Sequence, residues 1–298
     1  MTVVRATDGV RLHVEVDEID VAGPTVVYSH GFTAAHGEFL LQREALSGRV
    51  RQVFYDQRGH GRSDVGHHSH NTMEQLGRDL QSVLEATCPT GPVVLVGHLM
   101  GGMAVMAWAR THEAEVGTRV RGAFLLATSA DALITSGPLA RAVAVLTKLR
   151  LLAFGLWLLR LVAPLVTRAR KPGTRAGFRW TKRYLFGRGD DGDDDLVLLV
   201  QAMLEATPFT VAAAFYPVFL THDETSALPV LARIPTTVLC GTSDRLTPVS
   251  HSRTMAPLLR AELIEVPDCG HSVNVTRPDL VNEALLALVD RAVRGRAA

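Results

Sequence analysis

Six short apolar runs in this chain alternate with segments that are long enough to form helices. Each run has the length of a buried strand. Strands that alternate with helices are joined by right-handed crossovers, which place them in a mostly parallel sheet with helices on both faces. The chain is therefore predicted to have an α/β fold. The six runs are residues 25–29, 52–55, 93–96, 123–127, 237–240 and 263–266.

Two segments depart from this alternation. Residues 2–19 contain two β-rich stretches around a turn at Asp8 and Gly9, which predicts a hairpin at an antiparallel edge and brings the sheet to eight strands. Later in the chain, a long stretch has its apolar residues at helical spacing, which predicts a helical cap inserted over the sheet. We therefore expect a core of residues 1–130 and 226–298 and a cap of residues 131–225.

Local signals mark the start of several helices. Thr72 followed by Gln75 is a capping box, and it predicts a helix that runs to about Thr87. Residues 100–110 form a second predicted helix directly after a strand. Pro278 suits the first turn of a final helix because its missing N–H group is not needed there.

Composition and charge narrow the class of protein. The formal net charge of +1 gives no reason to expect a nucleic acid as a partner. Three cysteines without a metal-ligand spacing favour reduced thiols and a cytoplasmic protein, and the N-terminus lacks the apolar stretch of a secretory signal. The most apolar run, residues 151–159, is about half of what a membrane span needs, and Arg160 and Pro164 interrupt its continuation.

The apolar run that ends at residue 96 leads into the pattern that most directly indicates chemistry. A tight turn flanked by Gly97 and Gly101 joins this strand to a helix, which is the context of a nucleophile elbow. Small residues are needed on either side because the central residue sits in a strained turn, packed against the neighbouring strand and helix. The central residue of this turn is Leu99, with His98 before it and Met100 after it.

Five motifs in this order and at this spacing resemble the α/β-hydrolase superfamily, particularly its esterase, lipase and C–C-bond hydrolase branches. The resemblance covers nearly the whole chain. One motif, residues 56–64, is rich in charge but matches a structural turn of the family. The five motifs are His30-Gly31-Phe32, residues 56–64, residues 97–101, residues 241–244 and residues 270–272.

The resemblance implies roles for individual residues. Asp244 matches the acid of the family's catalytic triad and His271 matches its base, while Leu99 stands at the position of the nucleophile. The backbone N–H groups of Phe32 and Met100 match the oxyanion hole. Further pocket and elbow positions are His30, Gly31, Gly97, His98 and Gly101.

Leu99 excludes covalent catalysis at the elbow because its side chain has no group that His271 could activate. Two interpretations stay open. In the first, the chain is a hydrolase of carboxylic esters or thioesters in which the nucleophile has been replaced and the rest of the site is intact. In the second, it is a natural pseudo-hydrolase that acts without a covalent step, as a lyase, a cyclase or a ligand-binding protein that uses Asp244 and His271.

A cysteine and a cluster of histidines outside the elbow are the other candidate sources of chemistry. Cys269 is near His271 in sequence but lies outside the elbow, and buried cysteines are usually inert. His67, His68 and His70 lie in a polar loop without accompanying acidic ligands, so a solvated loop is favoured over a metal site. We expect neither a metal nor a cofactor.

The predicted cap has an unusual charge distribution. Residues 132–189 contain twelve Lys or Arg residues and no Asp or Glu, interleaved with apolar residues, and five Asp residues follow by position 195. One interpretation is contact with an anionic membrane surface or with the carrier of an acyl substrate. The alternative is that the apolar faces pack on the sheet and the basic faces are solvated or paired. Both predict a pocket for an apolar acyl substrate.

Overall fold

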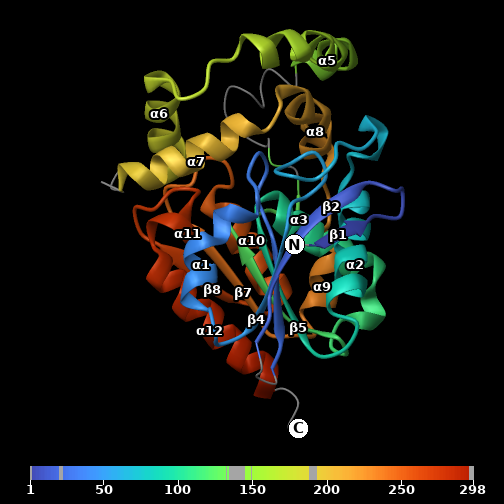
Figure 1. The fold of residues 1–298 in the computed structure, drawn as a ribbon, viewed down its shortest axis with the longest axis vertical. Helices are drawn as coiled ribbons and strands as arrows, with labels where there is room; N and C mark the ends of the chain where they lie inside the picture. The colour runs from blue at the N-terminus through green and yellow to red at the C-terminus, as the bar shows by residue number, and fades with distance from the viewer. Residues whose placement is uncertain are drawn as a thin grey trace.

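The computed structural model describes residues 2–19, 23–131, 133, 145–148, 150–187 and 193–294 (Figure 1). Its centre is an eight-stranded sheet in the order β1-β2-β4-β3-β5-β6-β7-β8. The strand β2 pairs antiparallel with β1 and β4, and all other neighbouring strands are parallel. The predicted α/β fold with an antiparallel edge is confirmed. The strands are β1 (Thr2–Arg5), β2 (Arg11–Asp17), β3 (Thr25–Ser29), β4 (Arg51–Tyr55), β5 (Val93–His98), β6 (Val120–Leu126), β7 (Thr236–Gly241) and β8 (Glu262–Val266).

Helices cover both faces of the sheet because its central strands are apolar on both sides. In β3, Val26 and Tyr28 point to one face and are buried in one apolar cluster, and Val27 points to the other face and is buried in a second cluster. Figure 1 shows the two helical layers. One layer consists of α1 (Leu40–Ala45), α11 (Val273–Thr276) and α12 (Pro278–Arg294), and the other of α2 (Met73–Thr87), α3 (Met100–Thr111), α9 (Leu228–Leu231) and α10 (Val249–Leu259).

The predicted helix starts are confirmed. The side chain of Thr72 accepts a hydrogen bond of 3.1 Å from the backbone N–H of Gln75, and α2 ends at Thr87. Pro278 begins α12, and α3 begins at Met100, directly after the turn that follows β5.

Helices make up most of what the structure describes between β6 and β7, and they lie over the end of the sheet at which the elbow is found (Figure 1). The helices are α5 (Leu152–Ala169), α6 (Arg175–Thr181), α7 (Asp194–Ala206) and α8 (Phe209–Thr221), with a π-helical turn at Lys182–Phe186. Arg160 and Pro164 interrupt the apolar run but do not end α5, which continues to Ala169. This helix packs along α8.

Candidate active site

Leu99 lies in a sharp turn between β5 and α3. Its φ of 44° and ψ of −109° are unfavourable for an L-residue with a side chain. Backbone contacts hold the turn, since the N–H of Leu99 donates to the carbonyl of Leu126 (3.1 Å) and its carbonyl accepts from Thr128 Oγ1 (2.6 Å). A Cβ atom on Gly97 would lie 2.6 Å from the carbonyl oxygen of Gly101. The segment from β5 to α3 therefore folds into the sharp turn predicted from Gly97 and Gly101.

Asp244 and His271 are buried and bonded to each other. The distance from Asp244 Oδ2 to His271 Nδ1 is 2.7 Å, and Asp244 also accepts hydrogen bonds from Leu246 and Thr247. Burial raises the pKa of Asp244, but the charge and hydrogen bond of His271, together with those from Thr247, outweigh it and hold this pKa below its ordinary value. Among the described residues nothing hydrogen-bonds to the buried Nε2 of His271. This ring is thus oriented by a carboxylate on one side and has a free nitrogen on the other.

A second histidine–carboxylate pair lies beside the first. His98 Nδ1 is 2.8 Å from Glu38 Oε1, and the other oxygen of Glu38 accepts the N–H of Gly31 at 2.8 Å. Burial lowers the pKa of His98, but Glu38 outweighs it and raises this pKa above its ordinary value. The imidazole rings of His98 and His271 have centroids 4.7 Å apart, and His98 Nε2 also has no hydrogen-bond partner within the described part of the chain.

A cavity of about 420 Å³ lies between these groups and the helices that follow β6. Its floor comes from the loops that follow the strands of the sheet, and its roof comes from α6, α7, α8 and the π-helical turn. Phe32 and Phe219 join the two parts, with ring centroids 4.9 Å apart. The floor includes Phe32, Glu38, His98, Leu99, Arg245 and His271, and the roof includes Trp180, Leu185, Val200, Met203, Leu204, Tyr216 and Phe219.

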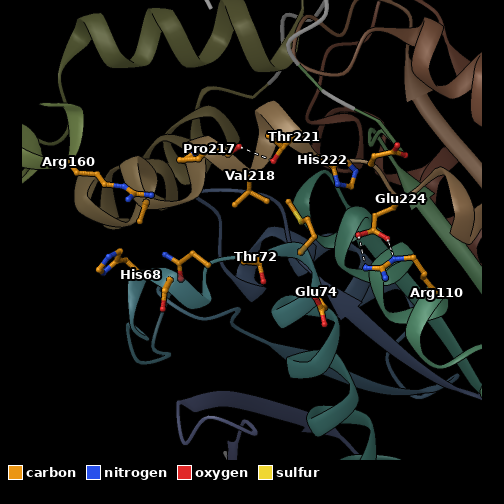
Figure 2. A pocket seen from close by; sticks show the side chains of 15 residues that line it. His68, Thr72, Glu74, Arg110, Arg160, Pro217, Val218, Thr221, His222 and Glu224 are labelled. Atoms are coloured by element: carbon orange, nitrogen blue, oxygen red, sulfur yellow. Dashed lines mark hydrogen bonds and ion pairs between the residues drawn. The ribbon is translucent and has the colours of Figure 1, made fainter. Parts of the chain in front are cut away.

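A second hollow, of about 580 Å³, lies on the flank of the molecule between the start of α2 and the end of α8 (Figure 2). Figure 2 shows Arg110 and Glu224 joined in this groove, at a distance of 2.7 Å, and Arg160 reaching toward it from α5. Among the described residues, the groove and the elbow cavity share no lining residue. The elbow cavity is smaller, but Leu99 and the rings of His98 and His271 line it together, so it is the candidate active site.

A metal ion has one candidate set of ligands in the described part of the chain, formed by His13, His36 and Asp56. These groups already bond within a hydrogen-bond network: His36 Nδ1 is 2.9 Å from Asp56, and His13 Nε2 is 3.2 Å from Glu15. Arg43 also lies 2.7 Å from Glu15 and adds positive charge next to the set. The arrangement is therefore that of a structural ion-pair network that joins β2 to the segments after β3 and β4.

Comparison with known proteins decides the family. The group described as the alpha/beta hydrolase family matches residues 26–284 of the sequence. The chain belongs to the alpha/beta hydrolase family.

Individual members resemble this alpha/beta hydrolase over most of their length. The 3-oxoadipate enol-lactonase 1 of Acinetobacter baylyi is 26% identical over 256 residues, which cover 86% of this chain and 85% of that protein. A thermophilic esterase from Thermogutta terrifontis, also 26% identical, superposes with a TM-score of 0.76 over 98% of both chains. The enol-lactonase from Burkholderia xenovorans LB400, at 22% identity, has a TM-score of 0.74 and covers 97% of this chain and 100% of its own.

The structure places the residues expected from the sequence in two groups. Phe32, His98, Leu99 and His271 meet at the cavity floor, and Asp244 lies behind His271. The second group is buried behind the floor. Met100 begins α3, and Gly97 and Gly101 pack at the elbow. The backbone N–H of Gly31 donates to Glu38, and His30 accepts the N–H of Gln57 at 2.9 Å.

His30 connects the loops after β3 and β4, and burial lowers its pKa. Cys269 is fully buried, with Sγ 2.8 Å from Thr276 Oγ1, and is not among the residues that line the cavity. Within the loop of three histidines, His70 pairs with Asp8 at 2.8 Å.

Glu38 was not predicted from the sequence, because no local pattern links it to His98, sixty positions later.

The charged motif at residues 56–64 has structural contacts. Arg58 is fully buried and donates to Asp79 (2.6 Å) and Asp8 (2.8 Å). Asp56 accepts the backbone N–H groups of His36 and Arg62. These bonds tie the antiparallel edge and α2 to the loop after β4, and they agree with the interpretation of this motif as a structural turn.

Proposed function

We propose that this alpha/beta hydrolase binds an apolar carboxylic ester or thioester in the elbow cavity, with the acid and base of a hydrolase in place and the covalent step blocked at Leu99. One observation carries the proposal: His271 is oriented by the buried carboxylate of Asp244, and its unpartnered Nε2 belongs to a ring that lines the same cavity as Leu99. Residues of these types in this arrangement serve to deprotonate a hydroxyl group at the elbow.

With a hydroxyl group at position 99, the site would support ester hydrolysis through an acyl-enzyme. His271 Nε2 takes the hydroxyl proton while the oxygen attacks the ester carbonyl carbon, and Asp244 stabilises the imidazolium that forms. The backbone N–H groups of Phe32 and Met100 are assigned to the oxyanion of the tetrahedral intermediate. The imidazolium then protonates the leaving alcohol or thiol, and a water molecule deprotonated by His271 hydrolyses the acyl-enzyme.

The substrate class follows from the roof. It is composed mainly of apolar and aromatic side chains, such as Leu185, Val200 and Met203, which bind an acyl chain by burial rather than by hydrogen bonds. A volume of about 420 Å³ suits a small or medium-sized ester. The similarity to an esterase and to enol-lactonases supports the same class of bond.

Leu99→Ser tests the proposal, with Leu99→Ala as the matched control. We expect Leu99→Ser to raise the hydrolysis of short- and medium-chain nitrophenyl esters by at least about 10³-fold over the unsubstituted chain. A fluorophosphonate probe should label the elbow peptide of Leu99→Ser alone, because the other two proteins lack the hydroxyl that it modifies. A folded Leu99→Ser protein that leaves all tested esters and thioesters intact contradicts the proposal.

The two adjacent imidazoles favour one alternative. With centroids 4.7 Å apart and both Nε2 atoms unpartnered, His98 and His271 present a proton donor and a proton acceptor to one ligand. Such a pair fits a lyase, cyclase or ligand-binding protein that never forms a covalent intermediate. This alternative predicts that Leu99→Ser gains no esterase activity and that His271→Ala abolishes exchange of carbon-bound ligand protons with deuterated solvent.

A further inference from the structure

The outer face of α5 carries a row of exposed apolar side chains. Their spacing of three or four residues places them on one side of the helix, and we call them the outer stripe. Their exposed fractions run from 42% at Leu158 to 69% at Leu165. Soluble proteins rarely leave a row of large apolar residues in water unless it contacts another surface. The outer stripe consists of Phe154, Trp157, Leu158, Leu161 and Leu165.

The opposite face of α5 packs on α8, so the helix lies along the folded body. By length and composition α5 would also suffice to cross a membrane, with 18 residues and a mean hydropathy of 1.5. Its packing on α8 favours an orientation along a surface instead. Arg160, in the middle of the helix, reaches toward the groove near His68 and leaves the outer stripe apolar (Figure 2).

Positive charge surrounds the outer stripe. Arg150 precedes α5, and Arg168, Arg170 and Lys171 follow at its end, all exposed. The nearest acidic run begins α7 at the far end of the cap (Figure 1), where Asp194 pairs with Lys182 at 2.8 Å. Two copies of the chain that met through their outer stripes would bring these positive charges together at a cost, whereas anionic lipid headgroups would neutralise them.

We propose that the outer stripe of α5 docks on the surface of an anionic lipid bilayer, with the helix parallel to the membrane plane. The apolar side chains enter the boundary between headgroups and acyl chains, Trp157 takes the interfacial position that its amphipathic ring favours, and the flanking basic residues contact the headgroups. The proposal does not depend on the hydrolase activity, since it concerns only the outer surface of the cap.

Vesicle flotation with the full chain tests this docking. We expect at least tenfold more protein to float with vesicles of phosphatidylcholine and phosphatidylserine than with phosphatidylcholine alone, and binding to fall when salt rises from about 0.1 M to about 0.5 M. Tryptophan emission should shift to shorter wavelength on the anionic vesicles as Trp157 leaves water. Failure to float with either vesicle, or equal binding to both, overturns the proposal.

Substitutions locate the contact. Trp157→Asp and Leu165→Asp should each reduce binding to anionic vesicles at least tenfold, and Arg168→Glu should weaken it less. The matched control is Leu258→Asp, which places the same charge at a 53% exposed leucine of α10 in the sheet body, and it should bind normally. Equal loss in the control overturns the assignment to α5. A dimer on gel filtration that Trp157→Asp dissociates, without vesicle binding, assigns the stripe to a second copy and also overturns it.

Discussion

The floor and the roof of the elbow cavity are built by different interactions. His98 and His271 in the floor are each fixed by a carboxylate, at 2.8 Å and 2.7 Å, and Leu99 by hydrogen bonds to its backbone. The roof is held mainly by apolar packing. Val200 and Phe219, for example, are each buried in an apolar cluster. Directional bonds fix where a proton is taken or given, whereas apolar contacts fix only size and shape. Under the proposed function, we therefore expect the floor to determine the reaction and the roof to determine the substrate.

The largest effect should come from the buried acid of the floor. In the Leu99→Ser background, Asp244→Asn should lower kcat by about 10⁴-fold, because the amide no longer holds the productive tautomer of His271 or stabilises its charge. KM should change little, since Asp244 is not among the residues that line the cavity. Steady-state kinetics on one nitrophenyl ester measures both values. A loss of less than tenfold contradicts the role of Asp244.

Glu38 is predicted to act as a positioning residue with a smaller effect. Glu38→Gln in the Leu99→Ser background should lower kcat by about 10-fold to 100-fold, because Glu38 holds both His98 and the N–H of Gly31, next to the assigned oxyanion donor Phe32. It should also lower the pKa of His98, which histidine proton chemical shifts would report. Lost kcat with an unchanged His98 titration would indicate a purely structural role.

The pH dependence of stability should report on His98 and on the two carboxylates of the floor. The raised pKa of His98 means that the stabilisation from its pair is present below the unfolded value and lost as pH rises through the folded value. The pKa of Glu38 is lowered because His98 outweighs the opposing effect of burial, so its contribution is lost as pH falls below the ordinary carboxyl range.

For Asp244, whose pKa is also lowered, the stabilisation is lost as pH falls through the folded value. Denaturant unfolding across pH should therefore show that Glu38→Gln flattens the decline above neutral pH and that Asp244→Asn flattens the decline at acidic pH. A decline above neutral pH that Glu38→Gln leaves unchanged would contradict the assignment of the His98 pair.

Roof substitutions should change selectivity and leave the reaction intact. In the Leu99→Ser background, Met203→Phe should lower kcat/KM for the longest accepted acyl chain by about tenfold, with little effect on acetate esters, because a loss of pocket length removes the burial of one or two methylene groups. Met203→Leu keeps the volume and serves as the control. Equal losses on acetate and long-chain esters would show that the roof also takes part in the chemistry.

The smallest effect is expected at Cys269, which lies two positions from His271 but outside both floor and roof. Cys269→Ser should change kcat in the Leu99→Ser background by less than about twofold, since the thiol is buried, bonds to Thr276 and is not among the residues that line the cavity. Thiol-specific reagents should react with it slowly in the folded protein. A loss approaching that of Asp244→Asn would make Cys269 part of the site.

The sequence predicted those parts of the molecule that depend on local pattern. Strand runs and elbow glycines impose their geometry through neighbouring residues, and Asp244 and His271 follow strands whose ends meet at one edge of the sheet. The pairing of His98 with Glu38 was not predictable, because the two residues are brought together only by the packing of loops from different strands. The periodicity of α5 shows two apolar sides, but which side packs on α8 depends on the tertiary arrangement.

The backbone turn at Leu99 also affects how this protein can evolve. Holding a non-glycine residue at a φ of 44° costs about 1–3 kcal/mol, and the surrounding strands and helix maintain it through main-chain contacts. These contacts do not involve the side chain at position 99. Under the proposed function, a single substitution there would restore the nucleophile while the main-chain contacts of the turn stay the same, so a protein of this fold could change from ligand binding to catalysis without a change of scaffold.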